Sequence, residues 1–98
     1  MSTEAASEIS AIHEGFQRFL IENLSRHGIG PFFGFMLGHR AQHYKFVQEY
    51  LAAGLKNPNS DRSVLDQILE ASPLEYLRLE ERAMKLLLEI PIAGEGQS

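Results

Sequence analysis

The sequence predicts an all-α fold, an antiparallel bundle of three long helices and one short helix that assembles into an oligomer. Apolar residues recur at spacings of three and four along most of the chain, which is the period of a helix and not of a strand. Glycine, proline and serine gather between these periodic stretches, where helices would begin and end. With 98 residues, of which 44% are hydrophobic, the chain is expected to form a single helical domain over residues 1–90 and a disordered tail over residues 91–98.

The first helix is expected to begin near Ser2 or Thr3, whose hydroxyl groups can accept the unpaired backbone N–H groups of a first turn. It should end at His27, because Gly28 suits the C′ position that follows a helix. Its core side is formed by apolar residues spaced by three and four, namely Ile9, Ile12, Phe16, Leu20 and Leu24.

The second helix is expected over residues 31–55, since Pro31 is preset for the first turn of a helix. The link through Gly28, Ile29 and Gly30 is so short that it predicts an antiparallel hairpin with the first helix. Along one side of the second helix, small residues would let another backbone approach closely: Gly34, Gly38, Ala41 and Ala52.

A loop is expected at residues 56–60, where turn-forming residues follow one another. A short third helix then starts at Ser60, or at Ser63 with Asp66 as its acidic partner. The segment Ser-Pro-Leu-Glu at residues 72–75 predicts a fourth helix over residues 73–90, because it supplies an N-cap serine, a proline in the first turn and an acid at the third position.

The fourth helix has two apolar edges, and a chain of this size has too few internal partners to cover both. One edge comprises Leu74, Leu77, Met84, Leu87 and Leu88, and the other comprises Leu79, Ala83, Leu86 and Ile90. We therefore expect a second copy of the chain, or a larger protein, to bury the spare edge. The expected interaction surface consists of Gly34, Gly38, Leu79, Ala83, Leu86 and Ile90.

The histidines form the pattern that most suggests chemistry. His39 and His43 are four residues apart, so on one continuous helix they share a face, and the predicted hairpin brings His13 within about two helical turns of them. Neutral imidazoles bind transition metals such as zinc or iron, and carboxylates from a facing helix can complete such a site. The predicted metal ligands are His13, His39, His43, Glu80 and Glu81.

The competing interpretation is that these side chains only pack and form ion pairs. The histidine pair lacks the adjacent glutamate of the HExxH zinc-protease pattern and the Glu-x-x-His pattern of di-iron bundles. Arg40 would repel a cation, and it can instead pair with a carboxylate of Glu80, Glu81 or Glu14. Packing is therefore the favoured interpretation.

Composition and motifs disfavour several other classes. A formal net charge of −4 gives no attraction to nucleic acid, and the absence of cysteine excludes disulfides and thiolate chemistry. No nucleophile-elbow or phosphate-binding glycine motif is present, so an enzyme is not expected. The apolar run at residues 29–38 is about half the roughly 20 residues of a membrane-spanning helix, and the acidic N-terminus is unlike a secretory signal. A cytoplasmic protein without membrane association is the expectation.

These features predict a small non-catalytic helical accessory or regulatory protein, without a cofactor, that acts through self-association, most simply as a homodimer, and through binding to another protein. The alternative function is a metal-binding bundle with redox, storage or sensor chemistry, in which the histidine and carboxylate cluster would hold zinc or iron.

Overall fold

The computed structural model describes residues 11–57 and 63–93, and within these residues it is helical, as predicted. Five helices follow one another in this part of the chain: α2 Glu14–His27, α3 Ile29–Leu37, α4 Gln42–Leu55, α5 Val64–Glu70 and α6 Pro73–Glu89. The predicted helix start at Ser2 or Thr3, the predicted cap at Ser60 and residues 94–98 of the predicted tail lie outside the described residues. No described helix combines the length and the apolar character needed to cross a membrane.

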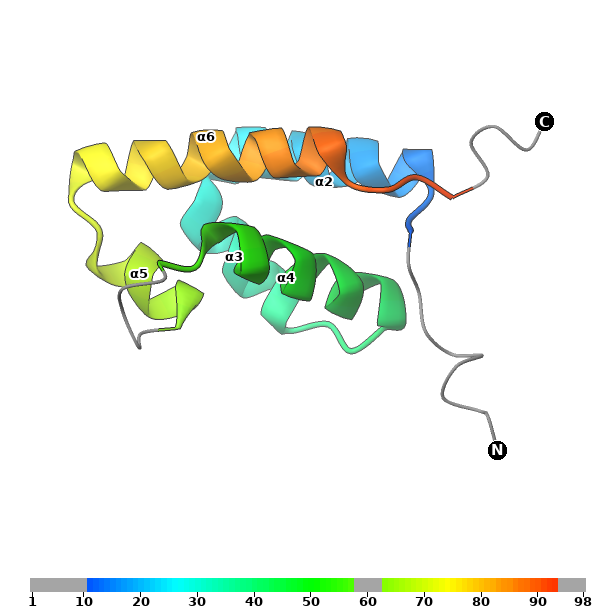
Figure 1. Ribbon diagram of the computed structural model, residues 1–98, viewed down its shortest axis with the longest axis horizontal. Helices are drawn as coiled ribbons and strands as arrows, with labels where there is room; N and C mark the ends of the chain where they lie inside the picture. The colour runs from blue at the N-terminus through cyan, green and yellow to red at the C-terminus, as the bar shows by residue number, and fades with distance from the viewer. Residues whose placement is uncertain (1–10, 58–62, 94–98) are drawn as a thin grey trace.

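Helices α2 and α6 lie side by side and run in opposite directions, forming one layer of the molecule (Figure 1). Near one end of this pair, the Gln17 Nε2 atom donates a hydrogen bond to the carbonyl oxygen of Leu87 at 2.8 Å. Helix α3 leads away from the end of α2 to a second layer that contains α4 and α5 (Figure 1). Because α3 contacts each of the other four helices, it connects the two layers.

The single helix predicted over residues 31–55 is wrong, because the chain breaks it at residues 38–41. Helix α3 ends at Leu37, where the backbone N–H of Gly38 bonds to the Phe35 carbonyl at 3.2 Å in place of a regular helical bond. The Gln48 side chain of α4 donates to the Met36 carbonyl at 2.6 Å, which satisfies an acceptor at the end of α3.

This break changes the predicted topology. Helix α4 runs in the same direction as α2, so these two segments do not form the expected antiparallel hairpin (Figure 1). The Phe16 ring near the start of α2 accordingly lies 5.0 Å from the Tyr44 ring near the start of α4. Helix α4 runs in the opposite direction to α6 (Figure 1), and the two are in contact where the Arg82 side chain of α6 donates to the carbonyl of Gly54 near the end of α4.

Three sequence signals at helix ends are confirmed, but the continuous first helix predicted from Ser2 or Thr3 to His27 is wrong, because residues 11–13 are not helical and α2 begins at Glu14. Gly28 follows α2 with φ +87°, ψ 166°, a backbone conformation that is essentially restricted to glycine, and its N–H bonds to the Leu24 carbonyl. The Ser63 side chain caps α5 by accepting the Asp66 N–H. Ser72 and Glu75 form the reciprocal capping box that starts α6.

The hydrophobic core lies between the layers and draws on every helix. Among the described residues its buried members are Ile12, Leu20, Leu24, Ile29, Phe32, Phe33, Met36, Val47, Leu51, Leu55, Val64, Ile68, Ala83, Leu87 and Ile90. Ile12 precedes α2 but is buried because it pairs with the segment after α6: its N–H donates to the Pro91 carbonyl at 3.0 Å, and its carbonyl accepts the Ala93 N–H at 2.7 Å. Residues 91–93 are thus part of the folded body, whereas they were predicted to belong to the tail.

Candidate interaction surfaces

The histidines of the second predicted helix lie in a cluster of aromatic rings where the starts of α2 and α4 meet the end of α3. The rings in this cluster are Phe16, Phe19, Phe35, His39, His43 and Tyr44. His39 stacks on Tyr44 with ring centroids 4.1 Å apart and an interplanar angle of 13°. His43 meets the Phe16 ring edge-on at 4.7 Å. Edge-on and stacked rings are favourable arrangements, so both histidines have a packing role.

The predicted metal ligands are not gathered into one site. His13 and His43 line a shallow cavity of about 400 Å³, but His39 instead packs between Phe35 and Tyr44. Glu81 is exposed on α6. Across residues 11–57 and 63–93, no group of three or more His, Asp or Glu side chains is placed to hold a metal ion.

Glu80 has a structural partner on another helix. Its Oε2 atom accepts the backbone N–H of Ile29 at 3.0 Å, and the Tyr76 hydroxyl accepts the N–H of Gly30 at 2.9 Å. These are the first two residues of α3, whose N-cap, Gly28, has no side chain to satisfy them. A carboxylate also complements the positive end of a helix dipole. The acid that was predicted to bind a metal therefore caps α3.

The predicted interaction surface is only partly exposed. Gly34 and Gly38 are exposed, and among the described residues an added Cβ at Gly34 would meet no atom of another segment within 4 Å. Ala83 and Ile90 are 0% and 3% exposed, which places them inside the chain and not on a docking surface. Leu79 and Leu86 are partly buried against the same core.

The close helix contact occurs at Gly54, a residue that sequence reasoning missed. A Cβ built at Gly54 would lie 2.6 Å from Leu86 Cδ1, so the absence of a side chain lets α6 pack directly on α4. A glycine inside a helix that otherwise has good helix formers was the available signal for the contact between Gly54 and Leu86.

The Tyr50 phenol on α4 has a raised pKa. Burial raises it, and the negative charge of Glu89 raises it further.

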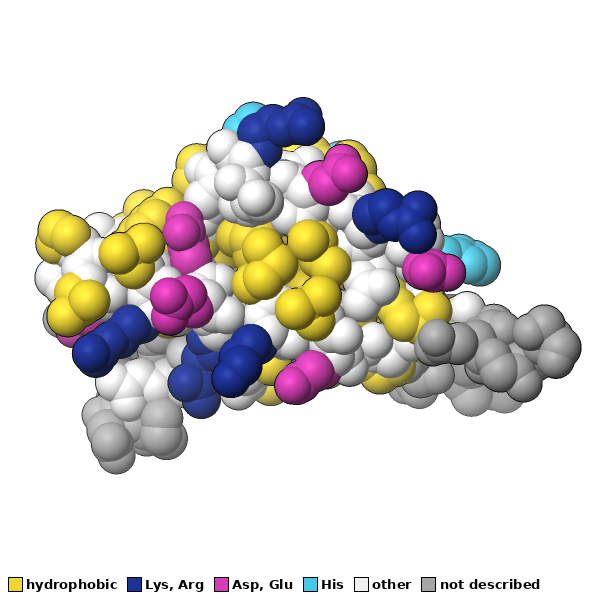
Figure 2. Space-filling view, turned by 90° about the horizontal axis from the view of Figure 1, so that it is seen from above, with side chains coloured by type: hydrophobic (Ala, Val, Ile, Leu, Met, Phe, Trp, Pro, Cys, Tyr) yellow, Lys and Arg dark blue, Asp and Glu magenta, His cyan; other side chains and the backbone are white. Residues whose placement is uncertain are grey.

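The exposed leucines of α6 belong to the edge that was not expected to dock, although Leu87 of that edge is fully buried. Leu74, Leu77 and Leu88 are 57%, 55% and 61% exposed. With Glu81 and the partly buried Met84 they form a line of residues that we call the α6 outer stripe: Leu74, Leu77, Glu81, Met84 and Leu88. Figure 2 looks down on the α2 and α6 layer and shows hydrophobic side chains gathered at one end and in the middle of this face, with acidic side chains between the two groups.

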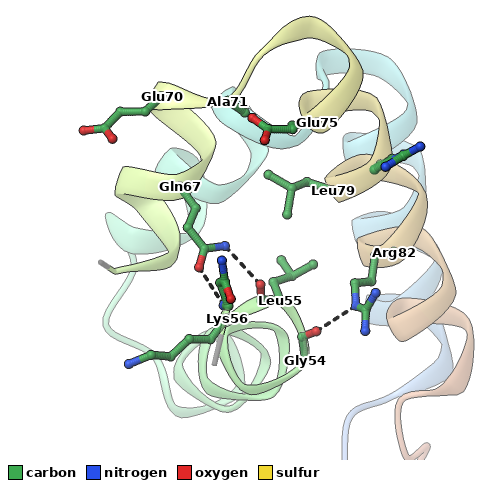
Figure 3. Close-up of a pocket in the computed structure, with 11 residues that line it drawn as sticks. Gly54, Leu55, Lys56, Gln67, Glu70, Ala71, Glu75, Leu79 and Arg82 are labelled. Carbon is green, nitrogen blue, oxygen red and sulfur yellow. Dashed lines mark hydrogen bonds between the residues drawn. The ribbon is translucent and has the colours of Figure 1, made fainter. Parts of the chain in front are cut away.

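A second hollow lies between the end of α4, α5 and the first half of α6, with a volume of about 590 Å³ (Figure 3). Leu79 points into it, while Gln67 donates to the Leu55 carbonyl at 3.0 Å and Arg82 donates to the Gly54 carbonyl at 3.0 Å. Glu75, also on its wall, is engaged in the capping box of α6. Gln67 and Arg82 thus join the end of α4 to α5 and α6 along the wall of this hollow.

Comparison with family models, curated proteins and solved structures finds no match to this chain. Function is therefore inferred from the chemistry of the surfaces described above.

Proposed function

We propose that this chain is a small non-catalytic accessory or regulatory protein that acts by binding, through the α6 outer stripe, to a second copy of itself and to another protein. The observation that carries the proposal is the exposure of Leu74, Leu77 and Leu88 by more than half along one edge of one helix. Scattered exposed leucines are ordinary on protein surfaces, but a row of them along one helix is typical of a docking surface.

The energetic reason is the cost of leaving such a row in water. Full burial of one leucine side chain is worth roughly 1.5–3 kcal/mol, so covering three that are more than half exposed would supply several kcal/mol toward association. The aromatic cluster adds a second apolar area, in which Phe19 and Phe35 are 42% and 38% exposed. The described residues contain no group of three possible metal ligands, Glu80 caps α3, and His39 and His43 pack against aromatic rings, so they do not support the metal-binding alternative.

Site-specific photo-crosslinking in cells of the native host tests this proposal. A photoreactive amino acid replaces Leu77 in one variant and Lys45, an exposed residue of α4, in the control variant. We expect discrete crosslinked products, identified by mass spectrometry, from position 77 and not from position 45. Adding Leu88→Gln to the first variant should remove them. Equal products from both positions, or none from position 77, would contradict the proposal.

A further inference from the structure

We infer that the self-associated form is an antiparallel dimer across the α6 outer stripe, in which Leu77 packs on the partner's Leu88 and Glu81 lies beside the partner's Lys85. This inference rests on the proposed function, because it specifies which copy-to-copy contact the exposed leucines make. It differs from the interaction surface expected from the sequence, since that surface lies mostly on the buried edge of α6.

The spacing of the stripe defines the shape of its occupant. Its five positions, 74, 77, 81, 84 and 88, are separated alternately by three and four residues, which is the repeat of a two-helix seam. At about 1.5 Å per residue the stripe is roughly 20 Å long and its part from Leu77 to Leu88 is roughly 16 Å long, so one further helix can cover that part. The outer face of α6 in a second copy is such a helix.

The composition of the stripe also indicates which side chains a helix packed on it needs. Leucines lie toward both ends of the stripe, and the exposed carboxylate of Glu81 lies in its middle. If only apolar atoms covered Glu81, its carboxylate would lose its hydration without gaining an ion pair or a hydrogen bond, which is unfavourable. The occupant therefore needs leucines and, near its middle, a cation. Helix α6 itself carries both, because Lys85 is exposed and lies one turn after Glu81.

Chain direction follows from charge. A parallel, in-register copy would place Glu81 against the partner's Glu81, which brings two like charges together in a partly dry interface. An antiparallel copy centred on the stripe would also place Glu81 against Glu81, so we infer an antiparallel copy shifted by three residues, in which Leu77 faces the partner's Leu88 and Glu81 faces the partner's Met84 next to the partner's Lys85. A two-fold axis makes each contact twice. In the described part of the chain neither Glu81 nor Lys85 forms an ion pair, so both charges are available to a partner.

Sedimentation velocity over a dilution series tests the leucine contact. The unchanged protein is expected to dimerise, and Leu77→Gln and Leu88→Gln should each raise the dimer dissociation constant by roughly tenfold or more. The matched control is Leu37→Gln, which alters a leucine of α3 that is 46% exposed and lies off the stripe, and it should change the constant less than about twofold. Circular dichroism confirms that each variant is folded, which is expected because all three side chains are exposed. A control effect as large as that of the stripe variants would overturn the inference.

Substitutions of Glu81 and Lys85 test the contact between these two charges and the relative direction of the two α6 helices. Glu81→Lys and Lys85→Glu should each weaken the dimer roughly fivefold, whereas an equal mixture of the two variants should recover the original affinity, because each supplies the opposite charge to the other. Glu81→Gln should weaken an antiparallel dimer and strengthen a parallel one. A strengthened Glu81→Gln dimer, or a mixture that stays as weak as its components, would overturn the antiparallel arrangement.

The crosslinking experiment separates this inference from the proposed function. If the unchanged protein is monomeric at the highest concentration but position 77 crosslinks to a different protein in cells, then the dimer is wrong and the docking function stands. If position 77 crosslinks to nothing and the protein is monomeric, both are wrong.

Discussion

The carboxylate of Glu80 accepts the backbone N–H of Ile29 at 3.0 Å, across 51 residues of sequence. Together with the Tyr76 hydroxyl, it supplies to α3 the capping groups that the residue before α3 cannot provide. The caps are thus tertiary contacts, which join α6 to the helix that connects the two layers.

Removing these caps should destabilise the whole fold. We expect Glu80→Ala to lower the free energy of unfolding by about 1–2 kcal/mol and Tyr76→Phe by about 1 kcal/mol, because each leaves a partly buried N–H without an acceptor. Urea denaturation followed by circular dichroism measures both. Glu22→Ala, which removes an exposed acid of α2, is the control and should change stability by less than about 0.5 kcal/mol. A Glu80→Ala variant as stable as that control would contradict the capping role.

The contact between Gly54 and Leu86 predicts that the effect of Gly54→Ala on the free energy of unfolding depends on the size of residue 86. Alanine at position 54 would collide with the Leu86 side chain, so Gly54→Ala should cost about 1–2 kcal/mol although alanine favours helices by about 1 kcal/mol over glycine. In a Leu86→Ala background the collision disappears, and the same change should become neutral or stabilising by up to about 1 kcal/mol. A double-mutant cycle from thermal or urea unfolding measures the coupling, and additive effects would show that the two residues do not press on each other.

Because of Tyr50, the free energy of unfolding should decrease at alkaline pH. Burial and then the charge of Glu89 raise the pKa of its phenol, so the folded state favours the neutral form. This contribution is fully present below the unfolded pKa of about 10 and is lost as the pH rises through the higher folded value. Glu89→Gln should lower the pKa of Tyr50 toward its usual value. Absorbance titration of the phenolate measures it, with Tyr50→Phe identifying which transition belongs to this residue. An unchanged titration in Glu89→Gln would exclude the coupling.

Treatment with a metal chelator should not change the stability of the protein. The described residues provide no group of three ligands, and His39 and His43 are engaged with aromatic rings. We therefore expect protein purified without a histidine tag to contain no stoichiometric zinc or iron and to have the same melting temperature with and without a chelator. His39→Ala should cost about 0.5–1.5 kcal/mol through the loss of its stacked ring, equally in both conditions. Bound metal that disappears in His39→Ala and His43→Ala would revive the metal-binding alternative.

The sequence predicts the end of α2 and the starts of α5 and α6 because these helix ends depend on local chemistry. The serines before α5 and α6 act within three residues of themselves, and Gly28 suits a backbone conformation that other residues avoid. The break at residues 38–41 was missed because His39 and His43 were assigned to the apolar face, although no large apolar residue lies between Leu37 and Tyr44. Only the completed fold shows Gln48 closing the end of α3. His39 lies before α4 begins, so the helical spacing that placed it on the same face as His43 did not apply.

The exposed leucines of α6 were not identified from the sequence for a different reason. Both edges carry large apolar residues, so spacing alone cannot tell which one faces the core. The choice depends on small partners: Ala83 is fully buried, and Gly54 on α4 admits Leu86. These are pairings between distant segments, and they leave the leucines at positions 74, 77 and 88 outside.

Helix α6 contacts α2, α3 and α4, yet it follows all of them in the chain. A nascent polypeptide that has left the ribosome only as far as α5 therefore still lacks Ala83 and Leu87, which fill the core, and Glu80, which caps α3. Until residues 73–89 emerge, the apolar faces of the earlier helices remain accessible to chaperones. Stable folding of this protein is consequently expected to follow synthesis of α6 and not to accompany elongation helix by helix.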